Sequence, residues 1–249
     1  MYGVVLLSQF VGMAIALGLA LVRGDSVPGG NDLLICLVAG VVGGIGITAL
    51  YRGLAIGRMG IVAPVTGVLA AIIPVSAGIL IEGAPGSAVL AGIGIAILSV
   101  VLVSRAADEG GGRAGLTEAL VSGVAIGCFG VLISGLSEGD VFSSLTVIRL
   151  VQAGLVIAAV LATRTAWRPP TDAVPAILVV GVLDMAGNSF YLLAVQTGAL
   201  AVASVLSALY PVATVILAAT VLRERVTRDH TIGIALAAVA IVLIGVGST

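Results

Sequence analysis

The feature that most constrains the fold is a series of nine apolar stretches, most of them about 20 residues long, joined by short polar connectors. A helix needs roughly 20 apolar residues to cross the hydrocarbon core of a bilayer. Membrane-spanning β-strands would alternate in polarity over about 10 residues, and these runs are too long and unbroken for that. We therefore expect an all-α polytopic membrane protein with about nine transmembrane helices. The predicted spans are residues 3–22, 31–51, 60–81, 87–104, 115–136, 143–163, 173–195, 199–222 and 230–247.

The charged residues agree with this interpretation and indicate an orientation. Only 9% of the chain is charged, against about a quarter in a soluble domain. The net charge of −1 gives no indication of nucleic-acid binding. In the nine-helix topology, nearly all the arginines outside the spans fall on one side, which the positive-inside rule makes cytoplasmic. We expect a multi-pass protein of the cell membrane, in a bacterial inner membrane, with the lipid bilayer as a partner.

An internal repeat divides the chain. The stretch "ITALYRGLAIGRMGIVAPV" around Tyr51 resembles "NSFYLLAVQTGALAVASV" around Tyr191, and "AAIIPVSAGILIEGAP" resembles "SALYPVATVILAATVLRERV". At a similar offset of about 140 residues, Gln9 aligns with Arg149. Repeats of this kind are typical of secondary transporters, where the two units often have inverted topology.

The two predicted units are unequal. Residues 1–104 form the first unit with four helices, 105–114 form a connector, and 115–249 form the second unit with five helices. The helix at 115–136 has no counterpart in the first unit. A first helix is therefore missing from the repeat, either because the chain starts late or because the helix was lost.

Two long segments resemble EamA-type permeases of the drug/metabolite transporter superfamily. They are "ALYRGLAIGRMGIVAPVTGVLAAIIPV" (49–75) and the more specific segment 183–245, which contains "LDMAGNSFYLL", "LYPV" and the "RER" turn. The resemblance implies ten helices in two inverted five-helix repeats around a central solute path. This chain departs from that pattern by one helix and by its "IEGAP" turn, which has no arginine. The resemblance implies transport, most commonly export of a metabolite or drug, and names no substrate.

Asp184 is the only ionisable residue near the middle of a predicted span. Even conservative scales assign a cost of about 2.5–3.5 kcal/mol to an aspartate at a helix centre, and such acids usually face a cavity. Asn188 and Tyr191 follow at i+4 and i+7, so the three side chains share one helical face. We expect this face to bind a solute, with a proton as a further candidate, acting as coupling ion. The alternative is a structural hydrogen bond between helices.

Further polar residues are predicted to complete the site. The first unit has Thr48 and Tyr51 at the positions equivalent to Asn188 and Tyr191, but no acid, so the predicted site is asymmetric. Ser207 and Tyr210 precede a proline within a span and are expected along the solute path. Close helix packing through small residues is the alternative for the serine.

Arg149 lies some six residues into its predicted span. One interpretation makes it a gating residue or an ion-pair partner of Asp184, and such a pair would keep the acid charged and so oppose proton coupling. In the other interpretation, the long side chain snorkels to the membrane interface. From the sequence we favour snorkelling.

Three functions remain in view. A secondary transporter of a small organic solute accounts for the repeat and the polar face, and no GxxxxGK[ST] phosphate loop is present. An intramembrane lipid-modifying enzyme would need a catalytic constellation, which one mid-span acid and the single histidine, His230, do not provide. A non-transporting paralogue or partner would account for the missing helix. We predict a permease with no enzymatic activity, metal or cofactor; the sequence leaves its homo-oligomeric state open.

Overall fold

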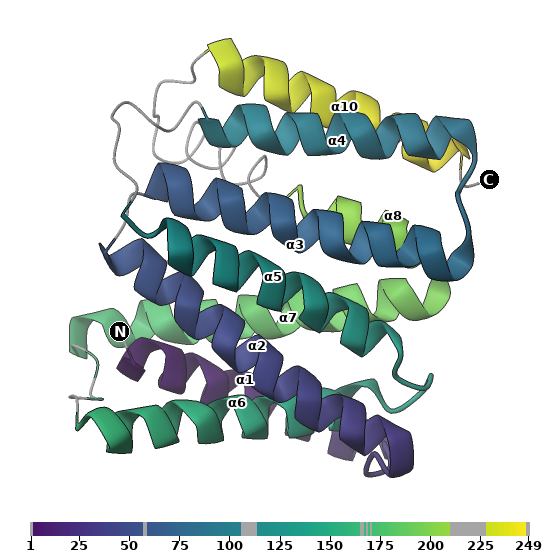
Figure 1. The fold of residues 1–249 in the computed structure, drawn as a ribbon. Coiled ribbons are helices and arrows are strands. Elements are labelled where there is room, and N and C mark those ends of the chain that lie inside the picture. The colour runs from purple at the N-terminus through teal and green to yellow at the C-terminus, as the bar shows by residue number, and fades with distance from the viewer. Residues whose placement is uncertain are drawn as a thin grey trace.

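The computed structural model describes residues 2–56, 59–105, 114–164, 167, 169, 171–209 and 228–247. Within these ranges the regular elements are all helices, and Figure 1 shows them running lengthwise through one bundle. They are α1 (Tyr2–Arg23), α2 (Gly30–Ile56), α3 (Met59–Glu82), α4 (Ser87–Arg105), α5 (Leu116–Ser134), α6 (Val141–Thr163), η1 (Thr171–Ala173), α7 (Val174–Thr197), α8 (Leu200–Ser207) and α10 (Arg228–Gly247).

These helices confirm the predicted all-α, polytopic membrane architecture. Each α-helix in the described ranges lies on one predicted span, and apart from α8 the ends differ by a few residues. Six helical segments of the described chain are long and apolar enough to cross a membrane, and the apolar parts of α4 and α10 are shorter. The predicted span 199–222 is represented by α8. The rest of that span from Tyr210 onward lies outside the described residues.

The bundle has two groups of helices, each with a core of its own. At one edge α4 and α10 lie side by side (Figure 1) and pack with α3 and α8 around a core that includes Val89, Val100 and Ala240. In the other group α1, α2, α5, α6 and α7 enclose a core that includes Ile133 and Ile148. Contacts of α5 with α3 and of α7 with α8 join the two groups.

Glycines explain how closely several of these helices approach. A methyl group added at Gly40 of α2 would lie 2.6 Å from the Cβ of Val151 in α6 and 3.1 Å from the carbonyl oxygen of Ile148. Gly123 and Gly127 of α5 are pressed against α3 in the same way. Small residues at contacts are a main source of helix association in lipid, where burial of apolar surface provides little driving force.

Helices that the internal repeat relates to one another make matching contacts. The repeat pairs α1 with α6 and α2 with α7, and α2 packs on α6 as α7 packs on α1. The aligned residues Gln9 and Arg149 touch directly, with 2.6 Å between Gln9 Oε1 and Arg149 Nη1. Equivalent positions meet in this way beside a two-fold axis. The division at residues 105–114, most of which lie outside the described ranges, stays a prediction.

The described arginines follow the predicted asymmetry between the two ends of the bundle. Consecutive helices run in opposite directions (Figure 1), which brings Arg52, Arg105, Arg164 and Arg228 to the end where α1 begins. Arg23 lies at the other end, where α1 finishes. The positive-inside rule predicts a cytoplasmic location for the arginine-rich end.

At the opposite end, hydrogen bonds tie the α1–α2 connector to the connector before α6. Asp140 accepts hydrogen bonds from the Ser26 hydroxyl at 2.5 Å and from the Ser26 backbone N–H at 2.9 Å. These two bonds lower the pKa of the Asp140 carboxyl, because they stabilise its charged form. In return, Asp25 accepts from the backbone N–H of Phe142 in the first turn of α6 at 3.0 Å. The carboxylates thus hold the two connectors together.

The packing role of Gly40 can be tested with Gly40→Ala. The added methyl group meets the backbone and Cβ atoms of α6, so we expect a loss of about 1–3 kcal/mol in the free energy of unfolding, as overpacking typically costs. The matched control is Gly154→Ala on α6, where the methyl group meets no atom within 4 Å. That variant should be neutral or slightly stabilised, because alanine favours helices. Thermal midpoints in detergent measure both, and equal midpoints would contradict the assignment.

Candidate functional site

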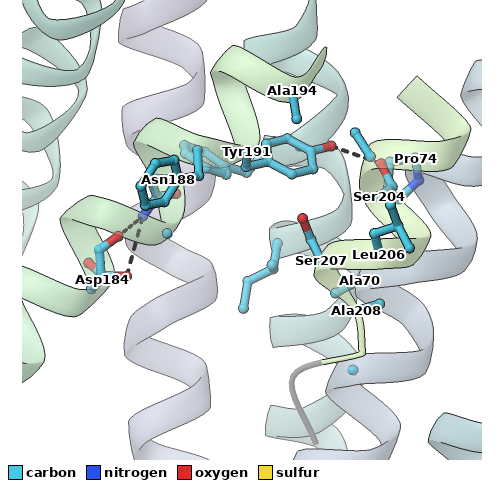
Figure 2. Close-up of a pocket in the computed structure, with 17 residues that line it drawn as sticks. Ala70, Pro74, Asp184, Asn188, Tyr191, Ala194, Ser204, Leu206, Ser207 and Ala208 are labelled. Carbon is cyan, nitrogen blue, oxygen red and sulfur yellow. Dashed lines mark hydrogen bonds between the residues drawn. The ribbon is translucent and has the colours of Figure 1, made fainter. Parts of the chain in front are cut away.

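A cavity of about 840 Å³ lies between α3, α5, α7 and α8. We call it the large cavity. Its described wall is mostly apolar and rich in glycine and alanine, with aromatic rings from α5 and α7. Its polar groups come from α7 and α8, as Figure 2 shows. They are Asp184, Asn188, Tyr191, Ser204 and Ser207.

The predicted polar face of α7 borders this cavity. Asp184, Asn188 and Tyr191 all line it, because their spacing holds them on one side of the helix. The Asn188 side-chain amide donates to the backbone carbonyl of Asp184 at 2.8 Å and to its carboxylate Oδ1 at 3.3 Å (Figure 2). Asn188 thereby holds the Asp184 side chain in place. Both of these hydrogen bonds use the Asn188 Nδ2 group as donor.

Tyr191 reaches across from α7 to α8. Its hydroxyl lies 2.9 Å from Ser204 Oγ, a contact drawn in Figure 2. Gly130 of α5 leaves the space for this hydroxyl, since a methyl group there would lie 2.9 Å from it. The ring thus closes one side of the large cavity. The contact of Ser204 with Tyr191 is a role that sequence reasoning missed.

The Arg149 side chain turns into the bundle. It is only 4% exposed, and its Nη2 lies 2.6 Å from Asp184 Oδ2. Its Nη1 donates to Gln9 Oε1 on α1. Gly12, one turn further along α1, leaves room for the guanidinium, because a methyl group there would lie 3.3 Å from Arg149 Nε. The snorkelling interpretation was therefore wrong: acceptors on α1 and α7 satisfy the guanidinium inside the bundle.

The ion pair of Arg149 and Asp184 makes this polar centre electrically neutral. A charge taken out of water into an apolar interior is costly, and a close partner with additional hydrogen bonds offsets part of that cost. The Asp184 side chain is 36% exposed, whereas Arg149 is almost fully enclosed. Because Asp184 lines the large cavity and Arg149 does not, a molecule in that cavity meets the carboxylate first.

A smaller cavity of about 110 Å³ adjoins the large cavity at Asp184 and Asn188. These two residues line both cavities, and Gln9, Arg149 and Gln152 line only the smaller one. Gln152 Oε1 is buried and has no hydrogen-bond partner in the described chain. Sequence reasoning missed Gln152, although a glutamine three residues after an arginine within an apolar span was a visible signal.

The other predicted site residues lie in different places. Ser207 lines the large cavity, and Tyr210 lies outside the described residues. Thr48 lines a third cavity, of about 400 Å³, between α2, α5 and α6. Tyr51 packs against an apolar cluster that includes Val5. The structure therefore does not bring Thr48 or Tyr51 to the described wall of the large cavity, because α2 packs against α5 and α6.

The polar groups around Asp184 are suited to binding a ligand through hydrogen bonds and charge. Asp184 is already paired with a guanidinium, and the remaining polar groups on the large cavity are an amide and hydroxyls. Within the described ranges, no three His, Cys, Asp or Glu side chains are grouped as metal ligands would be. These groups can accept and donate hydrogen bonds and balance charge in a mostly apolar wall, as ligand sites commonly do.

The model of the EamA-like transporter family matches residues 113–246, more than half of the chain. The chain belongs to the EamA-like transporter family. The resemblance inferred from the sequence is thus confirmed, and this EamA-like protein is a membrane transporter of the drug/metabolite type. The matched range includes α5, α6 and α7 and therefore contains both Arg149 and Asp184.

A solved crystal structure of a protein has a similar fold. It matches 97% of this chain and 89% of its own length with a TM-score of 0.81, at 18% sequence identity. At this identity the likeness shows the fold alone. No curated protein matches the chain in sequence.

The ion pair predicts a strong dependence of stability on both of its partners. Asp184→Asn leaves the enclosed guanidinium without its counter-charge, so we expect a loss of about 3–5 kcal/mol in the free energy of unfolding. The double variant Asp184→Asn with Arg149→Met removes both charges and should recover much of that loss. Unfolding in mixed detergent micelles measures the cycle.

The control for this cycle is the pair of Arg23 and Asp25, which are 3.5 Å apart with the arginine about half exposed. The Asp25 carboxylate is only 4% exposed, but it also accepts hydrogen bonds from the backbone N–H groups of Phe142 and Ser143. Arg23→Gln should therefore cost less than Asp184→Asn, because Asp25 keeps these donors. If the losses from Asp184→Asn and Arg149→Met simply add in the double variant, the two charges do not depend on each other as proposed.

Proposed function

We propose that this protein is a permease that moves a small organic solute through the large cavity by alternating access. The observation that carries the proposal is a mainly apolar cavity with a charged, hydrogen-bonded stripe on α7, in a chain of a transporter family. Its volume of about 840 Å³ falls in the range of small-molecule sites. The proposed location is the cell membrane, with the arginine-rich end in the cytoplasm.

The position of the cavity suits a rocking mechanism. Its walls come from α3 in the first predicted unit and from α5, α7 and α8 in the second. In alternating access, one unit moves against the other around a fixed central site. A cavity that is walled by both units would change its opening when they move. The proposed direction is export, following the commonest role of the family that the sequence resembles.

The lining favours a solute with an apolar body and few polar groups. Phe129, Phe190 and Tyr191 offer ring surfaces, while Asp184 and Asn188 offer an acceptor and an amide. Proton coupling at Asp184 is the less favoured form of the proposal, because the carboxylate already contacts Arg149 at 2.6 Å.

A cavity-filling variant tests the proposal. Ser207 lines the large cavity on α8, so Ser207→Trp should fill it and abolish most transport while leaving the thermal midpoint near that of the wild type. The control is Val182→Trp, since Val182 is exposed on α7 and does not line the cavity. Proteoliposomes loaded with a mixture of metabolites and drugs, followed by mass spectrometry, measure movement in both directions.

Two outcomes of this assay would count against the proposal. Equal transport by Ser207→Trp and wild type would remove the large cavity from the solute path. No movement of any solute by the wild type in either direction would favour the non-transporting paralogue.

A further inference from the structure

The third cavity is a groove that is separate from the proposed solute path. It lies mainly between α2, α5 and α6, with Tyr2 of α1 also in its wall. Its volume is about 400 Å³, and it shares no described lining residue with the large cavity. Its polar residues are Tyr2, Thr48, Arg52, Thr117 and Glu118. Arg52 lies near the end of α2 and Glu118 in the first turn of α5, so the charged part of the groove is at the arginine-rich end of the bundle.

The rest of the groove is apolar and faces outward. Its wall includes Ile45, Val121 and Leu155, one from each of α2, α5 and α6, and all three side chains are exposed on the protein surface. They lie further into their spans than the charged pair does. In a membrane-spanning bundle, exposed apolar side chains at this depth contact lipid chains. The groove therefore runs from the level of the lipid headgroups into the hydrocarbon.

The charged pair in the groove is open to a ligand. Arg52 Nε lies 3.5 Å from Glu118 Oε1, and the arginine side chain is 65% exposed while the glutamate is 20% exposed. This distance is longer than that of a charge-assisted hydrogen bond. Among the described residues, neither the Nη groups of Arg52 nor Oε2 of Glu118 has a further partner. Both ions therefore keep hydrogen-bonding capacity for a ligand.

Charge and geometry select a zwitterionic headgroup with N–H donors. The guanidinium fork of Arg52 matches two phosphate oxygens, and the Glu118 carboxylate matches an ammonium group. A ligand with one charge of each sign replaces one protein ion pair by two and leaves the groove neutral. A purely anionic lipid would place its charge beside Glu118, and a choline headgroup has no N–H to donate to the carboxylate.

We propose that this groove is a binding site for phosphatidylethanolamine. The phosphate binds Arg52, the ammonium group binds Glu118, and the acyl chains lie along Ile45, Val121 and Leu155. Thr48 and Thr117 stand where they can donate to the phosphate or ester oxygens. The bound lipid touches α2 of the first predicted unit together with α5 and α6 of the second. It therefore braces the two units, whichever solute the large cavity carries.

A series of phospholipids that differ only in their headgroups tests the proposed lipid site on the unmodified protein. Native mass spectrometry in detergent is run with phosphatidylethanolamine, its mono- and dimethylated forms, phosphatidylcholine and phosphatidylglycerol, all with the same acyl chains. Affinity should fall with each N–H that is lost. Phosphatidylcholine should bind roughly tenfold more weakly than phosphatidylethanolamine, a difference of about 1.4 kcal/mol. Equal affinities for these two, or stronger binding of phosphatidylglycerol, would overturn the proposal.

Glycerophosphoethanolamine, which has the same headgroup but no acyl chains, is used as a competitor to separate the contribution of the chains from that of the headgroup. It should compete only weakly, because it lacks the chains that contact the apolar wall. Competition at the concentration of the intact lipid would overturn the assignment of the groove to a lipid.

Two variants assign the roles of the charged residues. Glu118→Gln should remove the preference for ethanolamine over choline, and Arg52→Gln should weaken all the phospholipids to a similar extent. The control Arg23→Gln alters a pair of equal length at the other end of the bundle and should keep the full preference. The ratio of affinities is measured within each variant, so a change in stability does not alter it. A full preference retained in Glu118→Gln would overturn the proposal.

Discussion

The ion pair between Arg149 and Asp184 is the contact on which the centre of this bundle depends. The Arg149 guanidinium is only 4% exposed, and leaving it without an acceptor would be costly, because it has given up most of its water. The pair and the hydrogen bond from Arg149 to Gln9 therefore hold α1, α6 and α7 in one register. The same contact provides the large cavity with its charged group, since Asp184 keeps one side open to that cavity.

Around this centre, the packing of small residues decides where space remains. Gly40, Gly123 and Gly127 let α2, α5, α6 and α3 meet almost backbone to backbone. Association in lipid depends on such close packing, because apolar surface gains little by leaving one apolar medium for another. The large cavity lies where the two groups of helices meet and where Gly130 leaves room for Tyr191. Glycines thus serve both the close packing of the helices and the space at the proposed solute site.

The sequence predictions succeeded for properties that depend on residues close together in the chain, and failed for properties that depend on tertiary packing. The nine spans were readable because bilayer thickness sets helix length. Asp184, Asn188 and Tyr191 were correctly grouped because their shared face depends only on the helical repeat. Thr48 and Tyr51 were assigned to the same site through the internal repeat, and the structure places them elsewhere. Equivalent positions have different neighbours here, because α2 packs mainly against α5 and α6, whereas α7 packs mainly against α1.

The sequence by itself determined the helices, the family and the presence of an acid within an apolar helix, and its arginines predict which end is cytoplasmic. Tertiary structure alone decided what satisfies that acid. Arg149 had two physically sound outcomes, snorkelling to water or pairing inside, and the choice depended on acceptors carried by α1 and α7. Nothing within α6 encodes their distance. Burial of a charge is a property of the assembled bundle, because its free energy depends on every group that replaces the water it loses.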